Sequence, residues 1–115
     1  MKVCVPSYKG GLDDFVCEHF GRATTFTIYD TETGEVSVVR NTSEHFGGFG
    51  KPPELLRKIG VDVIVCSGMG ARAISLFNSY GIRVYMGARG RVRDAIRQYL
   101  NRELVEADES MGCLH

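Results

Sequence analysis

The run from Val61 to Cys66 constrains the fold of this chain more than any other segment. It reads VDVIVC, almost continuously apolar, and glycines follow it at Gly68 and Gly70. An apolar run of this length, without regular polar alternation, is typical of a strand buried on both faces of a parallel sheet. Such sheets carry helices on both sides, so the segment predicts an α/β domain.

The segments around this strand predict the rest of the architecture. Strand patterns occupy residues 2–6, 25–29, 36–40 and 82–86, and the polar link 30–35 suits a hairpin loop. Apolar residues recur at helical spacing from Pro52, within residues 73–80 and within residues 92–100. Right-handed crossovers then give a three-layer fold with a five-stranded mixed sheet and helices on both faces. Only the second strand opposes the others, an order (β-β-β-α-β-α-β-α) similar to the ribonuclease H-like fold.

Composition is ordinary for one globular domain. The chain has 115 residues, of which 43% are hydrophobic and 24% charged. We expect residues 1–104 to form the domain and the acidic residues 105–115 to form a flexible tail. No apolar run approaches the roughly 20 residues that span a bilayer, and the first strand leaves no room for a signal peptide, so we expect a cytoplasmic protein without a membrane partner.

The charge distribution argues against nucleic acid as a partner. Residues 1–50 hold four basic and seven acidic side chains, and residues 51–115 hold ten basic and seven acidic ones. The two parts therefore carry −3 and +3, which is milder than the strongly basic face of a nucleic-acid binder. A local basic site for a small anion is compatible with this balance.

The predicted topology brings four loops to one edge of the sheet. Residues 7–23, 41–52, 67–70 and 87–91 each follow a strand that runs in the common direction. Ligands of open α/β sheets usually bind at this carboxyl edge. The histidine, glycine and arginine clusters of the sequence all fall in these loops, so we expect a functional site there.

Cys17 and His19 are the first candidate ligands in these loops. A thiolate and an imidazole two residues apart can reach one soft metal ion, but a packed cysteine beside a loop histidine explains the same spacing. His45 lies in a glycine-rich loop and is either a ligand or a solvent-exposed residue. Cys66 ends the central strand and Cys4 lies inside the first, where a small core residue is the simpler interpretation. Cys113 and His115 form a Cys-x-His pair in the tail.

Three arginines, Arg89, Arg91 and Arg93, surround the start of the last predicted helix. Cations at a helix N-terminus oppose its dipole by about 0.3–1 kcal/mol each, so removal of Arg89 and Arg91 should keep or raise the melting temperature. Together with free backbone N–H groups they predict an anion site, although a solvated arginine face is the alternative. The turn at Gly68 and Gly70 could receive the same anion through backbone donors.

The motif at residues 18–23, EHFGRA, followed by Phe26, resembles the signature of the dinitrogenase iron–molybdenum cofactor biosynthesis family (NifX, NafY and the C-terminal part of NifB). The opening strand with its proline, the loop 44–48, the glycine turn 68–70 and the helix start at Gly90 resemble it in the same order. The match covers about residues 1–104. A cysteine stands at position 17, where the family pattern leads us to expect serine.

The resemblance implies that the chain binds an iron–sulfur or iron–molybdenum cluster, or a precursor, during cofactor assembly for nitrogen fixation. His19 matches the position most often implicated in such binding. We expect cluster contacts from His19, Cys17, Arg22, His45, Gly68, Gly70, Arg89 and Arg91, and metal ligation by His19 and Cys17 with His45 and Cys113. Its partners would then be the metal-cluster donor and acceptor proteins of the assembly pathway.

We therefore expect a binder or carrier rather than an enzyme. A regulatory or protein-interaction module that has kept the fold without the cluster is the alternative. A ribonuclease H-like nuclease is the enzymatic rival, but such nucleases hold two metal ions with carboxylates, one of them on the first strand. The first strand here reads KVCVP and carries no carboxylate, so the nuclease interpretation is weak.

Overall fold

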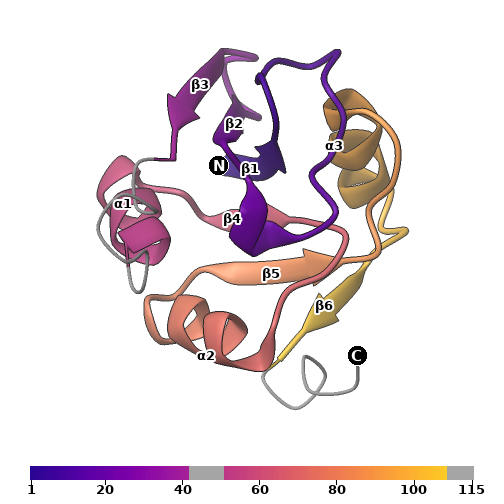
Figure 1. Cartoon of the computed structure of the whole chain (residues 1–115). Helices are drawn as coiled ribbons and strands as arrows, with labels where there is room; N and C mark the ends of the chain where they lie inside the picture. The colour runs from indigo at the N-terminus through magenta and orange to yellow at the C-terminus, as the bar shows by residue number, and fades with distance from the viewer. Residues whose placement is uncertain (42–50, 109–115) are drawn as a thin grey trace.

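A mixed sheet of six strands lies at the centre of the described part of the chain, in the order β3-β2-β1-β4-β5-β6 (Figure 1). This computed structural model describes residues 1–41 and 51–108. The strands are β1 (Lys2–Ser7), β2 (Thr25–Asp30), β3 (Val36–Arg40), β4 (Val63–Val65), β5 (Arg83–Met86) and β6 (Val105–Ala107). The helices are α1 (Lys51–Ile59), α2 (Ala71–Ser79) and α3 (Val92–Leu100), and a 3-10 turn, η1, covers Phe20–Arg22.

The strand directions agree with the sequence prediction for the first five strands. β2 is antiparallel to both β1 and β3, whereas β1, β4 and β5 are mutually parallel. The polar link between β2 and β3 turns at Asp30, whose carboxylate accepts the backbone N–H of Glu32 at 2.9 Å. Among these five strands only β2 opposes the others, so the loops after β1, β4 and β5 meet at one edge.

The prediction of five strands is wrong, because a sixth strand, β6, pairs antiparallel with β5. It begins at the first residue of the expected flexible tail, of which residues 109–115 lie outside the described part of the chain. The strand has three residues, and only Ala107 is buried, while Val105 and Glu106 are exposed. A strand this short and this exposed has no apolar pattern by which the sequence could reveal it. The assignment of the whole chain to the ribonuclease H-like fold stays a prediction.

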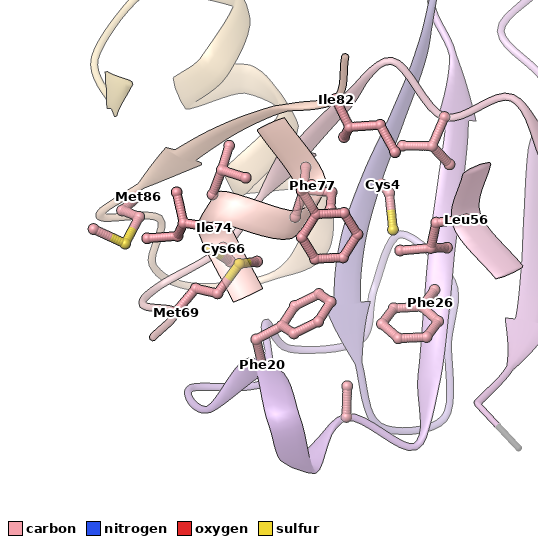
Figure 2. Packing of buried hydrophobic residues seen from close by; sticks show 14 of the residues in the cluster. Cys4, Phe20, Phe26, Leu56, Cys66, Met69, Ile74, Phe77, Ile82 and Met86 are labelled. Carbon is pink, nitrogen blue, oxygen red and sulfur yellow. The ribbon is translucent and has the colours of Figure 1, made fainter. Parts of the chain in front are cut away.

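The two faces of the sheet are covered unequally. On one face, Leu56 of α1 and Phe77 of α2 pack with Cys4 and Ile64 of the sheet (Figure 2). On the other face, α3 is the one helix of the described residues that packs on the sheet, and its Val92, Ala95 and Ile96 lie against the sheet valines Val3, Val5, Val63 and Val65. Successive residues of β1 and β4 therefore enter opposite cores, which explains the continuous apolar run. Each fully buried valine or leucine contributes roughly 1.5–3 kcal/mol.

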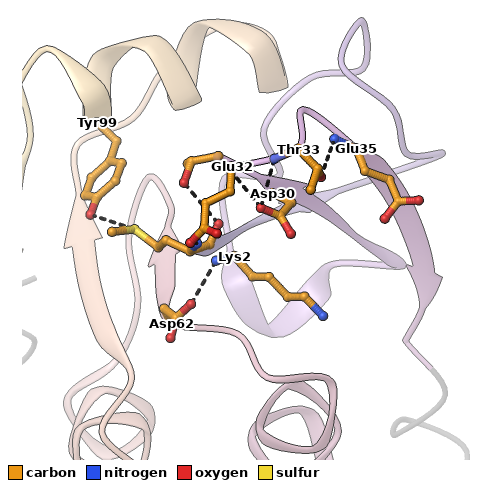
Figure 3. A network of polar contacts seen from close by, with 9 residues as sticks. Lys2, Asp30, Glu32, Thr33, Glu35, Asp62 and Tyr99 are labelled. Atoms are coloured by element: carbon orange, nitrogen blue, oxygen red, sulfur yellow. Dashed lines mark hydrogen bonds and ion pairs between the residues drawn. The ribbon is translucent and has the colours of Figure 1, made fainter.

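Polar contacts fix the edge of the sheet opposite the carboxyl ends of β1, β4 and β5 (Figure 3). The backbone N–H of Lys2 donates to the Asp62 carboxylate at 2.8 Å, and the Lys2 ammonium donates to the Ile59 carbonyl at 3.0 Å. These bonds connect β1 to the turn that precedes β4. Within residues 1–41 and 51–108, none of the helices has both the length and the apolar character needed to cross a membrane.

Candidate functional site

The loops that follow β1 and β4 form an open cleft at the carboxyl edge of the sheet. Residues 18–21, residues 67–70 and Ala73 line it, and its volume is about 660 Å³. His19 and Gly68 therefore lie on the same cleft, as the predicted topology requires. This cleft is the candidate site, and we call it the His19 cleft.

The backbone around His19 holds its imidazole at the surface. The His19 carbonyl accepts the Arg22 N–H at 2.9 Å, which closes η1, and also the Cys17 thiol at 3.3 Å. The next residue, Phe20, is buried against Phe26 and Phe77, with ring centroids 5.5 and 5.4 Å away (Figure 2). Phe20 thus anchors the turn in the core, and the exposed His19 side chain is left on the cleft.

Cys17 is placed differently from the predicted metal ligand. Its side chain is 2% exposed and belongs to the core between the sheet and helices α1 and α2. The thiol donates to the His19 carbonyl and does not line the cleft. Cys17 therefore lies next to His19, but its thiol supports the turn and does not face the cleft as a ligand would.

Gly68 and Gly70 form the wall opposite His19. Gly70 is the N-cap of α2, and no side chain caps this helix start. The first intrahelical bond runs from the Ile74 N–H to the Gly70 carbonyl. Within the described part of the chain, the N–H groups of Ala71, Arg72 and Ala73 consequently have no hydrogen-bond acceptor. Unpaired N–H groups and the positive end of the helix dipole favour an anion at this wall.

At the start of α3, backbone donors that the predicted anion site requires are already bonded. The N–H groups of Val92 and Arg93 donate to the carbonyls of Asp14 and Leu12, at 2.7 and 3.0 Å. The loop after β1 thus occupies the donors that an anion would need. The carbonyls lie about eighty residues earlier in the chain, so local sequence could not reveal them.

The two arginines proposed for that anion site lie outside the His19 cleft. The Arg91 guanidinium donates to the Asp13 carbonyl at 2.8 Å and lies 4.8 Å from the ring centroid of Phe15. Arg89 is exposed, and its backbone exchanges two hydrogen bonds with the Gln98 side chain. Arg22 is exposed at the end of η1, beside the residues that line the cleft. Of the predicted cations, only Arg22 therefore remains next to His19.

Asp14, in the loop after β1, has a structural role. Its carboxylate accepts the N–H groups of Tyr8, Lys9 and Gly10, each at 2.8 Å. Burial acts to raise the pKa of Asp14, but these backbone donors outweigh it and hold the pKa below its usual value. Asp14 thereby fixes the shape of the loop whose carbonyls accept the N–H groups at the start of α3. No local signal separates Asp14 from the adjacent Asp13, because both follow the two glycines of the turn.

Cys66 and Cys4 are core residues, in agreement with the simpler interpretation. Both side chains are 0% exposed. Burial raises the pKa of the Cys66 thiol to about 12, and burial together with the neighbouring Cys66 raises the pKa of Cys4 even further. A thiol that stays protonated at neutral pH is a poor metal ligand, because metals bind the thiolate.

The remaining predicted ligands lie outside the described residues: His45, Cys113 and His115. Within residues 1–41 and 51–108, no group of three or more His, Cys, Asp or Glu side chains is arranged to hold a metal ion. The His19 cleft therefore offers the His19 imidazole, the Glu18 carboxylate, the Met69 thioether and a row of backbone donors, rather than a closed coordination shell.

Residues 1–102 match the family described as dinitrogenase iron-molybdenum cofactor, and the chain belongs to this family. The match spans every element except β6 and includes the motif around His19. An uncharacterized protein of Methanocaldococcus jannaschii is 29% identical over 109 residues, which cover 90% of this chain and 89% of that protein.

This protein is also similar to solved structures. The apo form of the orange protein from Desulfovibrio gigas superposes with a TM-score of 0.86 at 28% identity and covers 92% of both chains. A putative NifB protein from Thermotoga superposes with a TM-score of 0.80 at 35% identity and covers 91% of both chains. The mixed α/β fold with three helices is thus shared along almost the whole chain.

Proposed function

We propose that this protein binds an iron–sulfur or iron–molybdenum cluster, or a precursor of one, as cargo in the His19 cleft. Membership of the dinitrogenase iron-molybdenum cofactor family supports the class of cargo. One structural observation carries the location: the exposed His19 imidazole faces the same cleft as the uncapped start of α2. The cleft therefore offers a metal ligand and an anion-binding wall together.

The chemistry of the two walls suits a cluster. A neutral imidazole nitrogen is a good ligand for iron. Iron–sulfide clusters are anionic, so their sulfides can accept the N–H groups at the start of α2 and are stabilised by the helix dipole. Gly68 and Gly70 carry no side chain, so the cluster can approach the backbone closely. Arg22 adds a positive charge beside His19.

The burial of the Cys17 thiol favours a supporting role over the direct ligation that the sequence predicted. As a metal ligand it would have to leave the core and give up its bond to the His19 carbonyl. In our proposal Cys17 instead fixes the turn that presents His19. His45 and Cys113 stay predictions as further ligands.

The openness of the site favours carriage over permanent storage. Among the described residues, no group of three or more His, Cys, Asp or Glu side chains surrounds the cleft, so a bound cluster keeps exchangeable positions. Such a cluster can pass between proteins by ligand exchange. The partners we propose are the metal-cluster donor and acceptor proteins of cofactor assembly, and we propose no catalytic step.

Anaerobic reconstitution with iron and sulfide, followed by metal analysis and absorption spectra, tests this proposal. The parent protein should retain iron and sulfide after desalting, and His19→Ala should lose most of it while its unfolding midpoint stays unchanged. Arg83→Ala, on an exposed residue at the opposite edge of the sheet, is the control and should behave as the parent. A parent that retains no cluster would instead favour the regulatory or protein-interaction alternative.

A further inference from the structure

A second pocket lies on the α3 face of the sheet, beyond the area that α3 covers. It has a volume of about 590 Å³, and its walls include Tyr85, Tyr99, Leu100, Arg102, Leu104 and Glu106. These residues come from β5, the end of α3, the link 101–104 and β6. None of them lines the His19 cleft. A role for this pocket is therefore independent of the proposed cluster site.

The apolar part of this pocket is preformed. The rings of Tyr85 and Tyr99 meet edge to face, with centroids 4.9 Å apart. The Tyr99 hydroxyl is held by a hydrogen bond to the sulfur of Met1 at 3.5 Å (Figure 3). Leu104 packs on the same core cluster as both tyrosines. Fixed aromatic and aliphatic walls are typical of small-molecule sites.

Two opposite charges line the same pocket. The Glu106 carboxylate accepts the Tyr85 hydroxyl at 3.3 Å, and its second oxygen has no hydrogen-bond donor among the described residues. Arg102 has a φ of 61°, the left-handed conformation in which glycine is unstrained. Its exposed guanidinium has no hydrogen-bond or ion-pair partner among the described residues. The guanidinium is available to a ligand.

We propose that this pocket binds a free α-amino acid with an apolar side chain. The ligand carboxylate would pair with Arg102, its ammonium group with Glu106, and its side chain would lie on Tyr99 and Leu104. A simple carboxylate would meet the repulsion of Glu106, and a simple amine that of Arg102. Only a ligand that carries both charges next to an apolar group complements the whole pocket.

The experiment uses the full-length protein labelled with ¹⁵N and four probes: leucine, phenylalanine, phenethylamine and 3-phenylpropionate. Amide shifts at millimolar concentrations locate the binding and give the dissociation constants. We expect both amino acids to shift Tyr85, Tyr99 and Leu104, and each single-charge analogue to bind at least about tenfold more weakly, as the loss of one charged hydrogen bond requires. Three results would each overturn the proposal. They are binding of the analogues as tightly as phenylalanine, no amide shifts with any probe, and shifts only around residues 67–73.

Two variants make the charge assignment falsifiable. Arg102→Gly should raise the thermal unfolding midpoint, because glycine is unstrained there, and should abolish amino-acid binding, so stability and binding move in opposite directions. Glu106→Gln keeps an acceptor for Tyr85 but removes the charge, and should let 3-phenylpropionate bind as well as phenylalanine. Arg89→Ala, an exposed arginine outside the pocket, is the control and should bind as the parent does. Unchanged binding in Arg102→Gly would refute the assignment.

Discussion

Replacement of Asp14 by alanine should weaken the fold far more than replacement of the adjacent Asp13. Three backbone N–H groups lose their acceptor in Asp14→Ala, each now bonded at 2.8 Å. Hydrogen bonds to a charged group contribute about 1.5–3 kcal/mol each when shielded from water, but this side chain is partly exposed and the three share one carboxylate. We therefore expect a total loss of about 2–3 kcal/mol in the free energy of unfolding.

Asp13→Ala is the matched control. The Asp13 side chain is 80% exposed and forms its ion pair with Arg93 at the surface, where such pairs contribute about 0–1 kcal/mol. Urea unfolding of both variants at pH 7, followed by circular dichroism, measures the difference. Equal losses in the two variants would refute the role that we give to the Asp14 carboxylate.

The pH dependence gives a second test of the same residue. Backbone donors lower the pKa of folded Asp14, so its stabilisation is present above the unfolded pKa of about 3.9 and is lost as the pH falls through the folded pKa. The stability difference between the parent and Asp14→Asn should therefore shrink below about pH 4. A difference that grows in acid would contradict this sign.

Three further predictions concern the loops around the two helix starts. Phe20→Ala should destabilise the protein by about 3 kcal/mol and also reduce cluster retention, because the buried ring anchors the turn that presents His19; urea unfolding and iron analysis measure the two effects. Arg91→Ala should lower stability by about 1 kcal/mol through its contacts to a loop carbonyl and an aromatic ring, whereas Arg89→Ala should change it by less than about 0.5 kcal/mol. This prediction differs from the sequence-based expectation that removal of both arginines keeps or raises the melting temperature, because that expectation did not include the contacts of Arg91. Gly10→Ala should cost more than Gly11→Ala in thermal unfolding, since both have positive φ but only at Gly10 would the new methyl group overlap a valine of β3.

The strands and helices were predictable where burial dictates a long pattern. The run at residues 61–66 enters two cores at once, and the repeats at residues 73–80 and 92–100 each face one core. Strand directions followed from the hairpin and the crossovers, and they placed His19 and Gly68 on one edge. β6 was missed because a three-residue edge strand buries one side chain and leaves no periodic signal.

The details of the site depended on contacts between distant loops, which the sequence does not display. In the sequence, the starts of α2 and α3 look alike, because both contain glycine. In the structure, the backbone donors at the start of α2 are free and those at the start of α3 are bonded. They differ because carbonyls of residues 12 and 14 reach one and not the other. In the same way, the side chain of Cys17 is buried and its thiol bonds the His19 carbonyl, an arrangement that the spacing of Cys17 and His19 does not reveal.

The most direct test of the central claim is a measurement of nitrogen coupling to the bound cluster. Reconstituted, reduced protein that carries ¹⁵N-labelled histidine should show histidine ¹⁵N hyperfine coupling in pulsed electron paramagnetic resonance, since the proposed ligand is an imidazole. The coupling should persist in His45→Ala and His115→Ala loaded in the same way, and it should disappear in whatever paramagnetic cluster His19→Ala retains. A histidine coupling that survives in His19→Ala would contradict the assignment of His19 as the metal ligand.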